Sequence, residues 1–163
     1  MRHPLQGFTL VELMVTIVIA GILLTIGAPS LISVYEGVRA NNNIEKIHNI
    51  MAFARNQAIS YGTRVNVCPF ASATSCGATT DWSGGIRVFI TDADNQDHEL
   101  RAIDNFNSND EIKGSAKSLT FAPDGLASGG SITYCPAGKA SNSKSITIST
   151  SGKVSYGADG ISC

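Results

Sequence analysis

The stretch that decides the fold is Gly7-Phe8-Thr9-Leu10-Val11-Glu12, because it opens a long apolar run that carries one carboxylate. From Leu10 to Ala28 the residues are apolar or glycine, apart from Glu12 and two threonines. The segment from Phe8 to Pro29 is close to the ~20 residues that a helix needs to cross a bilayer core. A charge at such a depth is disfavoured and usually marks a functional contact. The stretch therefore predicts a membrane-length helix in which Glu12 needs a cationic partner.

The same residues resemble the amino-terminal signal of type IV pilins and type II secretion pseudopilins. The resemblance rests on the coincidence of Gly7, the aromatic Phe8, the acidic Glu12 and the apolar helix. It implies a leader, Met1–Gly7, that a prepilin peptidase removes before methylating the new amino terminus at Phe8. It also implies that Glu12 pairs with the free amine of a neighbouring subunit. Electrostatics agrees, because in a low-dielectric bundle an ammonium group would keep the carboxylate charged.

Two other interpretations of this segment stay open. A secretory signal could be cleaved after Val18-Ile19-Ala20, but Glu12 would then lie in its apolar core. A plain single-pass anchor explains the length and gives no reason for Glu12 or for Gly7-Phe8. Arg2 favours a cytoplasmic leader. With the resemblance, this predicts an inner-membrane protein whose carboxyl-terminal domain lies in the periplasm, and which then enters a pilus filament, with a place at the tip as one option.

The rest of the chain has the composition of one exported, β-rich domain. The chain has 163 residues, a formal net charge of −1 and only 15% charged residues, and its second half is rich in Gly, Ser, Thr and Asn. This composition suits a domain with many turns better than a cytosolic enzyme. A near-neutral chain has no global attraction to nucleic acid, so any such binding would need a local patch.

Four cysteines follow the apolar segment: Cys68, Cys76, Cys135 and Cys163. An even number in an exported domain predicts two disulfides with three possible pairings. We favour Cys68–Cys76, which closes a short loop, together with Cys135–Cys163, which ties the last residue to the sheet. A zinc site is disfavoured because the chain has no C-x-x-C pair.

Beyond Pro29 the apolar residues recur at helical spacing as far as Tyr61, and Gly62 provides a stop. Pro29 predicts a kink or local melting near Ala28. Alternating stretches then predict short antiparallel strands separated by turns, at 64–68, 86–90, 119–121, 131–135, 145–149 and 153–156. The expected fold is α+β, with a long helix packed on an antiparallel sheet. The expected parts are a leader (1–7), a transmembrane or filament-core helix (8–29) and a globular domain (30–163).

The carboxyl-terminal pattern is similar to the GspH/FimT family of minor pilins and pseudopilins, and especially to its FimT- and FimU-like members. The residues that carry the similarity are Val67-Cys68-Pro69, Asp81-Trp82-Ser83-Gly84-Gly85, Phe121 with Gly125, and Gly152-Lys153-Val154. The similarity implies a minor pilin that helps to start pilus assembly. Alternatives are a type II secretion pseudopilin and a FimT-like DNA receptor. Implied partners are the major pilin, other minor pilins, the prepilin peptidase, the inner-membrane assembly machinery and, before assembly, membrane lipid.

Other candidate sites are weaker. Some FimT relatives bind DNA through G-R-x-R, where this chain has Gly152-Lys153-Val154-Ser155, so only a weak patch of Lys139, Lys144 and Lys153 could contact DNA. An acidic run, 92–99, could hold calcium, although its spacing departs from an EF-hand loop and a hydrated hairpin tip explains it better. No catalytic motif, cofactor loop or metal motif is present, so the sequence predicts no enzyme, cofactor or metal. Trp82, beside a glycine-rich turn, is expected to be a packing anchor.

Overall fold

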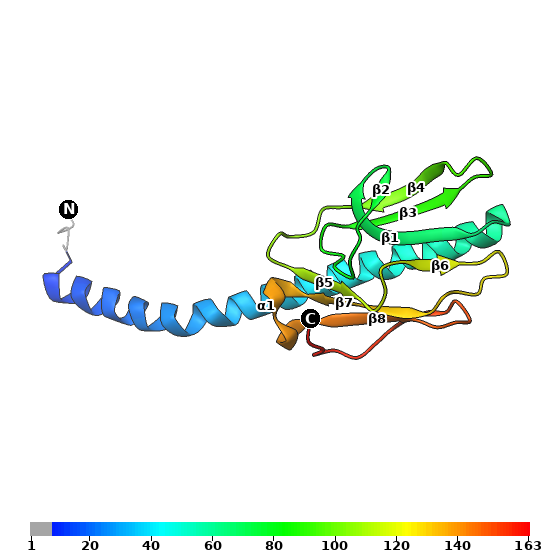
Figure 1. The fold of residues 1–163 in the computed structure, drawn as a ribbon. Coiled ribbons are helices and arrows are strands. Elements are labelled where there is room, and N and C mark those ends of the chain that lie inside the picture. Colours follow the sequence, from blue (N-terminus) through cyan, green and yellow to red (C-terminus); the bar gives the residue numbers. More distant parts are fainter. Residues whose placement is uncertain (1–7) are drawn as a thin grey trace, which may run out of the picture. The chain divides into compact units, whose positions relative to one another are not determined.

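The structure, a computed structural model, describes residues 8–163 and divides the chain into two compact units, with the boundary between Tyr35 and Glu36. The predicted leader, Met1–Gly7, lies outside the described residues. Helix α1 (Leu10–Tyr61) begins in the first unit and ends in the second (Figure 1). Of the kink or local melting predicted near Ala28, the melting is wrong, because α1 is helical without a break past Pro29, whereas the kink stays a prediction. Proline removes a single backbone donor, and the neighbouring turns keep theirs.

In the second unit, α1 buries the apolar stripe that its sequence spacing predicts. Ala40, Ile47, Met51 and Ala54 are fully buried. The helix ends at Tyr61, and Gly62 is the expected stop, with a φ of 62° in the left-handed region that closes many helices. The strands of the second unit pack their apolar side chains against this stripe, which forms part of the core.

The first sheet is antiparallel and centres on β1 (Val65–Ser72). One edge of β1 pairs with β3 (Ile86–Thr91), which in turn pairs with β4 (Asp97–Ile103). The other edge pairs with β6 (Leu119–Phe121) and, further along, with β2 (Ser75–Cys76). The short β2 was not predicted from the sequence.

The second sheet is also antiparallel and has the order β5-β7-β8-β9. Its strands are β5 (Glu111–Gly114), β7 (Gly130–Cys135), β8 (Lys144–Ile148) and β9 (Val154–Tyr156). Two short 3₁₀ turns, η1 (Pro136–Gly138) and η2 (Ala140–Asn142), connect β7 to β8. The sequence predicts strands of this kind, but not their division into two sheets or the presence of β5.

Trp82 packs in the core of the second unit, as predicted. Its side chain is fully buried, and its indole Nε1 donates a hydrogen bond to the carbonyl of Ala116 at 3.1 Å. Its backbone N–H donates to the carbonyl of Ile112 in β5 at 2.8 Å. A Cβ at Gly114 would lie 2.2 Å from the indole nitrogen, so only glycine fits beside this ring.

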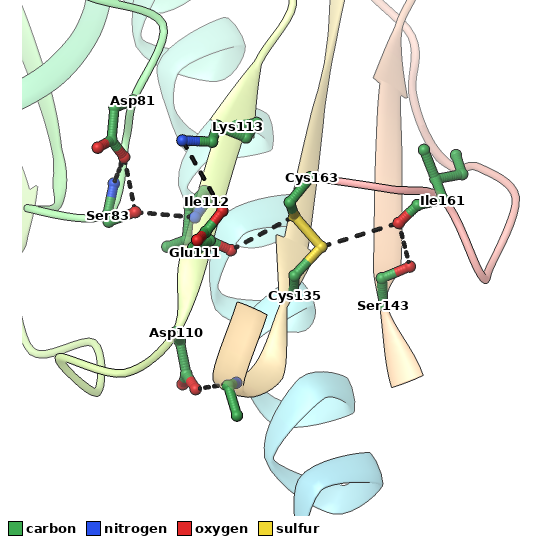
Figure 2. The surroundings of a disulfide bond; sticks show 11 residues. Asp81, Ser83, Asp110, Glu111, Ile112, Lys113, Cys135, Ser143, Ile161 and Cys163 are labelled. Carbon is green, nitrogen blue, oxygen red and sulfur yellow. Dashed lines mark hydrogen bonds and ion pairs between the residues drawn. A yellow bond between two sulfur atoms is a disulfide. The ribbon is translucent and has the colours of Figure 1, made fainter. Parts of the chain in front are cut away.

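Both favoured disulfides are formed, Cys68–Cys76 and Cys135–Cys163. The second joins Cys135, the last residue of β7, to Cys163, which lies beside β5 (Figure 2). The tail is also held by the Ser143 hydroxyl, which donates to the carbonyl of Ile161 at 2.7 Å.

Loss of the tail disulfide is expected to destabilise the domain more than loss of the hairpin disulfide. The cysteines are separated by 28 residues in one case and by 8 in the other. Chain-entropy estimates for these loops are about 3.5 and about 2.5 kcal/mol. Paired Cys→Ala variants at each bridge, compared by urea denaturation, test the order. Equal losses, or a larger loss for Cys68 and Cys76, would contradict the entropic account.

Candidate functional site

The first unit presents an apolar helix surface with almost no internal cover. Every large apolar side chain from Leu10 to Leu24 is at least half exposed, and Phe8 is 88% exposed. Among the described residues, α1 is the one helix long and apolar enough to cross a membrane, with a mean hydropathy of 2.4 in its most apolar window. Exposed apolar surface costs about 25 cal/mol per Å² in water. This surface therefore requires lipid or other helices around it.

Glu12 caps the amino terminus of its own helix. Its Oε2 accepts hydrogen bonds from the backbone N–H and from the hydroxyl of Thr9, both at 3.1 Å. In return, the N–H of Glu12 donates to the Thr9 hydroxyl at 3.2 Å. This reciprocal pair is a capping box. The Thr9-x-x-Glu12 spacing is its sequence signature, which could have revealed the role of Thr9.

Although Glu12 takes part in the capping box, its negative charge has no cationic partner among the described residues. None of the ion pairs among residues 8–163 involves Glu12, and its Oε1 makes no hydrogen bond to the described part of the chain. One oxygen is thus held by the helix terminus while the other can accept a donor from outside. The predicted cleavage point at Gly7 lies outside the described residues.

A second polar site, which we name the Asp110 cluster, ties α1 to the second sheet. It consists of Asp110, Arg39, Asn43, Tyr134 and the N–H of Ala137. The fully buried Asp110 carboxylate accepts from Arg39 Nη2 at 2.7 Å and from the Ala137 N–H at 2.9 Å. The Tyr134 hydroxyl donates to the same carboxylate and accepts from Asn43 Nδ2 at 2.7 Å.

The environment of Tyr134 keeps its hydroxyl protonated. Burial raises the pKa of Tyr134 well above its ordinary value, and the hydrogen bond to Asp110 adds to the effect. Sequence reasoning missed the cluster because Arg39 and Asp110 are 71 residues apart. The Asp110 cluster has a structural role, because its hydrogen bonds join α1, β7 and η1.

The lysines of the predicted DNA patch are largely engaged by carboxylates. Lys139 Nζ donates to Glu36 Oε1 at 2.8 Å, and the same bond, more than any other contact, lowers the pKa of Glu36. Lys144 pairs with Asp159. Lys153 is exposed and forms no ion pair with the described residues. The structure therefore leaves a single uncompensated lysine where the sequence suggests a patch of three.

Gly152, which precedes Lys153, has a packing role of its own. Its φ is 77°, and a Cβ there would lie 1.9 Å from the carbonyl oxygen of Gly125. That carbonyl also accepts a hydrogen bond from Arg55 Nε at 3.1 Å. The glycine of the Gly152-Lys153 pair is thus explained by the close approach of two turns.

The acidic run 92–99 separates into two structural roles. Asp92 orders the turn between β3 and β4, since its carboxylate accepts from the N–H groups of Asp94 and Gln96 and pairs with His98. These hydrogen bonds, with that of His98 foremost, lower the pKa of Asp92. The expected hairpin tip is therefore correct for 92–96.

Asp97 and Glu99 belong to β4, and they flank the buried Arg87. The Arg87 guanidinium lies 3.3 Å from Asp97 and 3.4 Å from Glu99, and it stacks over the Phe89 ring. No group of three or more metal-binding side chains occurs among the described residues. The calcium alternative therefore gains no support from the part of the chain that the structure describes.

The comparisons with known proteins agree with this architecture. Residues 43–152 match the family model for the type II transport protein GspH, and residues 5–28 match the prokaryotic N-terminal methylation motif. No curated protein sequence matches the chain.

The solved folds that are similar to this one include a minor pilin and a minor pseudopilin. The type IV minor pilin FimU of Pseudomonas aeruginosa has a TM-score of 0.61 at 18% identity, over 73% of this chain and 88% of its own. The minor pseudopilin EpsH of Vibrio cholerae has a TM-score of 0.59 at 11% identity, over 74% and 97%. Because the GspH model covers more than half of the residues, the chain belongs to the GspH family of minor pilins and pseudopilins.

Proposed function

We propose that this protein is a minor pilin of a type IV pilus that helps to initiate filament assembly. A prepilin peptidase removes Met1–Gly7 and methylates Phe8. Before assembly the apolar half of α1 lies in the inner membrane with the second unit in the periplasm. On assembly this helix leaves the lipid and enters the helical bundle of the filament, where major pilin and other minor pilins surround it.

The observation that carries the proposal is the exposed apolar helix with Glu12 at its start. Each large apolar side chain from Leu10 to Leu24 is at least half exposed, which suits lipid first and neighbouring helices later. Glu12 needs a cation, and the described residues supply none. The free amine at Phe8 of an adjacent subunit has the required charge, and it would reach the Glu12 oxygen that the capping box leaves unused.

Replacing Gly7 is expected to prevent maturation. A side chain at this position should block access of the peptidase to the peptide bond before Phe8, so that Gly7→Ala or a bulkier variant keeps its leader. Intact-mass spectrometry of the purified chain should then show no loss of residues 1–7 and no methyl group. The wild type from a strain without the peptidase is the matched reference. A variant that still begins with N-methylated Phe8 would refute the assigned cleavage site.

A second candidate is a pseudopilin of a type II secretion system. The GspH match and the fold similarity to EpsH favour it as much as the fold similarity to FimU favours a pilus. Deletion of the gene separates the two candidates, since loss of pili and of twitching motility supports the first. Loss of secreted exoproteins with normal pili would replace our proposal by the second.

A further inference from the structure

Two outer strands, β4 of the first sheet and β5 of the second, are protected against pairing with another chain. Strand β4 carries Asp97, His98, Glu99 and Arg101, and its pairing with β3 is shifted by an irregularity. Charges and bulges of this kind discourage strand addition. In the second sheet, the outer strand β5 is covered by the segment 80–82, whose Trp82 N–H donates to the carbonyl of Ile112 in β5.

Strand β9 differs, because it is open and carries neither charge nor proline. It is the last strand of its sheet and pairs only with β8 among the described residues. The N–H of Gly157 donates to Ser145, and the carbonyl of Lys153 accepts from Ser149. Because hydrogen-bonding groups alternate along an antiparallel strand, the N–H and C=O groups of Val154 and Tyr156 point to the open side.

A cleft of about 580 Å³ lies next to this open strand, between α1 and the end of the second sheet. Its wall includes the Tyr156 ring, which is 60% exposed and stacks on His48 with the ring centroids 4.8 Å apart. Tyr156 thus offers unpaired backbone groups and an aromatic face at one place. The lining residues are Asn41, Ile44, Glu45, Lys144, Tyr156, Gly157 and Asp159.

The charges of the cleft indicate what it can accept. Lys144 and Asp159 neutralise each other in an ion pair. Glu45 is exposed and forms no ion pair with any described residue. The cleft therefore keeps one uncompensated negative charge, beside an aromatic ring.

We propose that β9 and this cleft form a docking site for an extended segment of another polypeptide that carries a lysine or arginine. The segment pairs with Val154 and Tyr156 as an added strand, and its basic side chain enters the cleft beside Tyr156 and reaches Glu45. Because only two residues of β9 are open, the bound segment makes few backbone hydrogen bonds, and these fix its orientation. The cleft provides the preference for a basic side chain. The site does not depend on the filament role proposed above.

A peptide library tests the site on the full-length protein in detergent micelles. The probes are fluorescent hexapeptides with five randomised positions and lysine, glutamine or glutamate at the fixed one. The lysine library should give the largest rise in fluorescence anisotropy when the protein is added, and the peptides that bind are selected from it. Hydrogen exchange should then slow at the Val154 and Tyr156 amides when a selected peptide is added. Glu45→Gln should weaken the selected lysine peptide about fivefold, which is the effect of one surface ion pair.

Matched controls separate this mode from other binding. Asp104→Asn removes an exposed acid outside the cleft and should leave peptide affinity unchanged. Backbone N-methylation of the selected peptide should abolish binding, because it removes the donors that an added strand needs. Absence of selection from any library overturns the proposal. So does binding that survives N-methylation, or protection of Val154 and Tyr156 by self-association of the protein without peptide.

Discussion

Glu12→Gln is expected to leave membrane insertion and folding intact and to reduce incorporation into filaments about a hundredfold or more. Glutamine can still accept the Thr9 hydrogen bonds, so the capping box of α1 is kept. The negative charge is lost, and the amine of the neighbouring subunit is left unpaired in an apolar bundle. Removal of one partner of such a pair costs about 3–5 kcal/mol. The amount of the protein in sheared filaments, relative to that in membranes, measures the effect.

Two further variants separate the effect of the Glu12 charge from its effect on helix capping. Thr9→Val removes the hydroxyl and keeps the carboxylate, so it should weaken the helix terminus by about 1 kcal/mol and incorporate far better than Glu12→Gln. Glu12→Ala removes both functions and should be at least as defective as Glu12→Gln. Filaments with wild-type amounts of the Glu12→Gln protein would refute the role of the charge.

Asp110→Ala should destabilise the second unit by about 3–5 kcal/mol, as expected when one partner of a buried ion pair is removed. The substitution leaves the guanidinium of Arg39, the hydroxyl of Tyr134 and the N–H of Ala137 without their shared acceptor. At about 2–4 °C per kcal/mol for a domain of this size, the melting temperature should fall by about 10 °C. Thermal unfolding followed by circular dichroism at 222 nm measures the change.

Asp159→Ala is the matched control for Asp110. This carboxylate also pairs with a cation, Lys144, but its side chain is 61% exposed. An exposed pair contributes about 1 kcal/mol or less, so the melting temperature should hardly change. Similar losses for the two variants would mean that burial of Asp110 does not determine its contribution.

The features that sequence reasoning found are those encoded by local pattern. The apolar run with Glu12, the stripe from Ala40 to Ala58 and the stop at Gly62 are all periodic or positional signals within one helix. The two disulfides followed from the export context and from loop length. Trp82 was recognisable because a large aromatic side chain beside small residues has few places to go except the core.

The features that were missed depend on contacts between distant segments. Asp110 occurs in a polar stretch, 104–110, that reads as a loop, and only the fold brings Arg39 and Tyr134 to it. Arg87 alternates with apolar neighbours, which predicts an outward side chain, whereas Asp97 and Glu99 of the adjacent strand allow it to be buried. The residue pattern of a strand predicts which side chains share a face, but it does not predict which other segments pack over that face.

The bridge to Cys163 has a consequence for the order of biogenesis. In the proposed orientation, this bond cannot close until Cys163 has crossed the inner membrane and met an oxidant. Completion of the domain therefore follows translocation of the chain as far as Cys163. In cells without a periplasmic thiol oxidase, the apolar anchor is inserted normally and the subunit is exposed to proteases before it can polymerise.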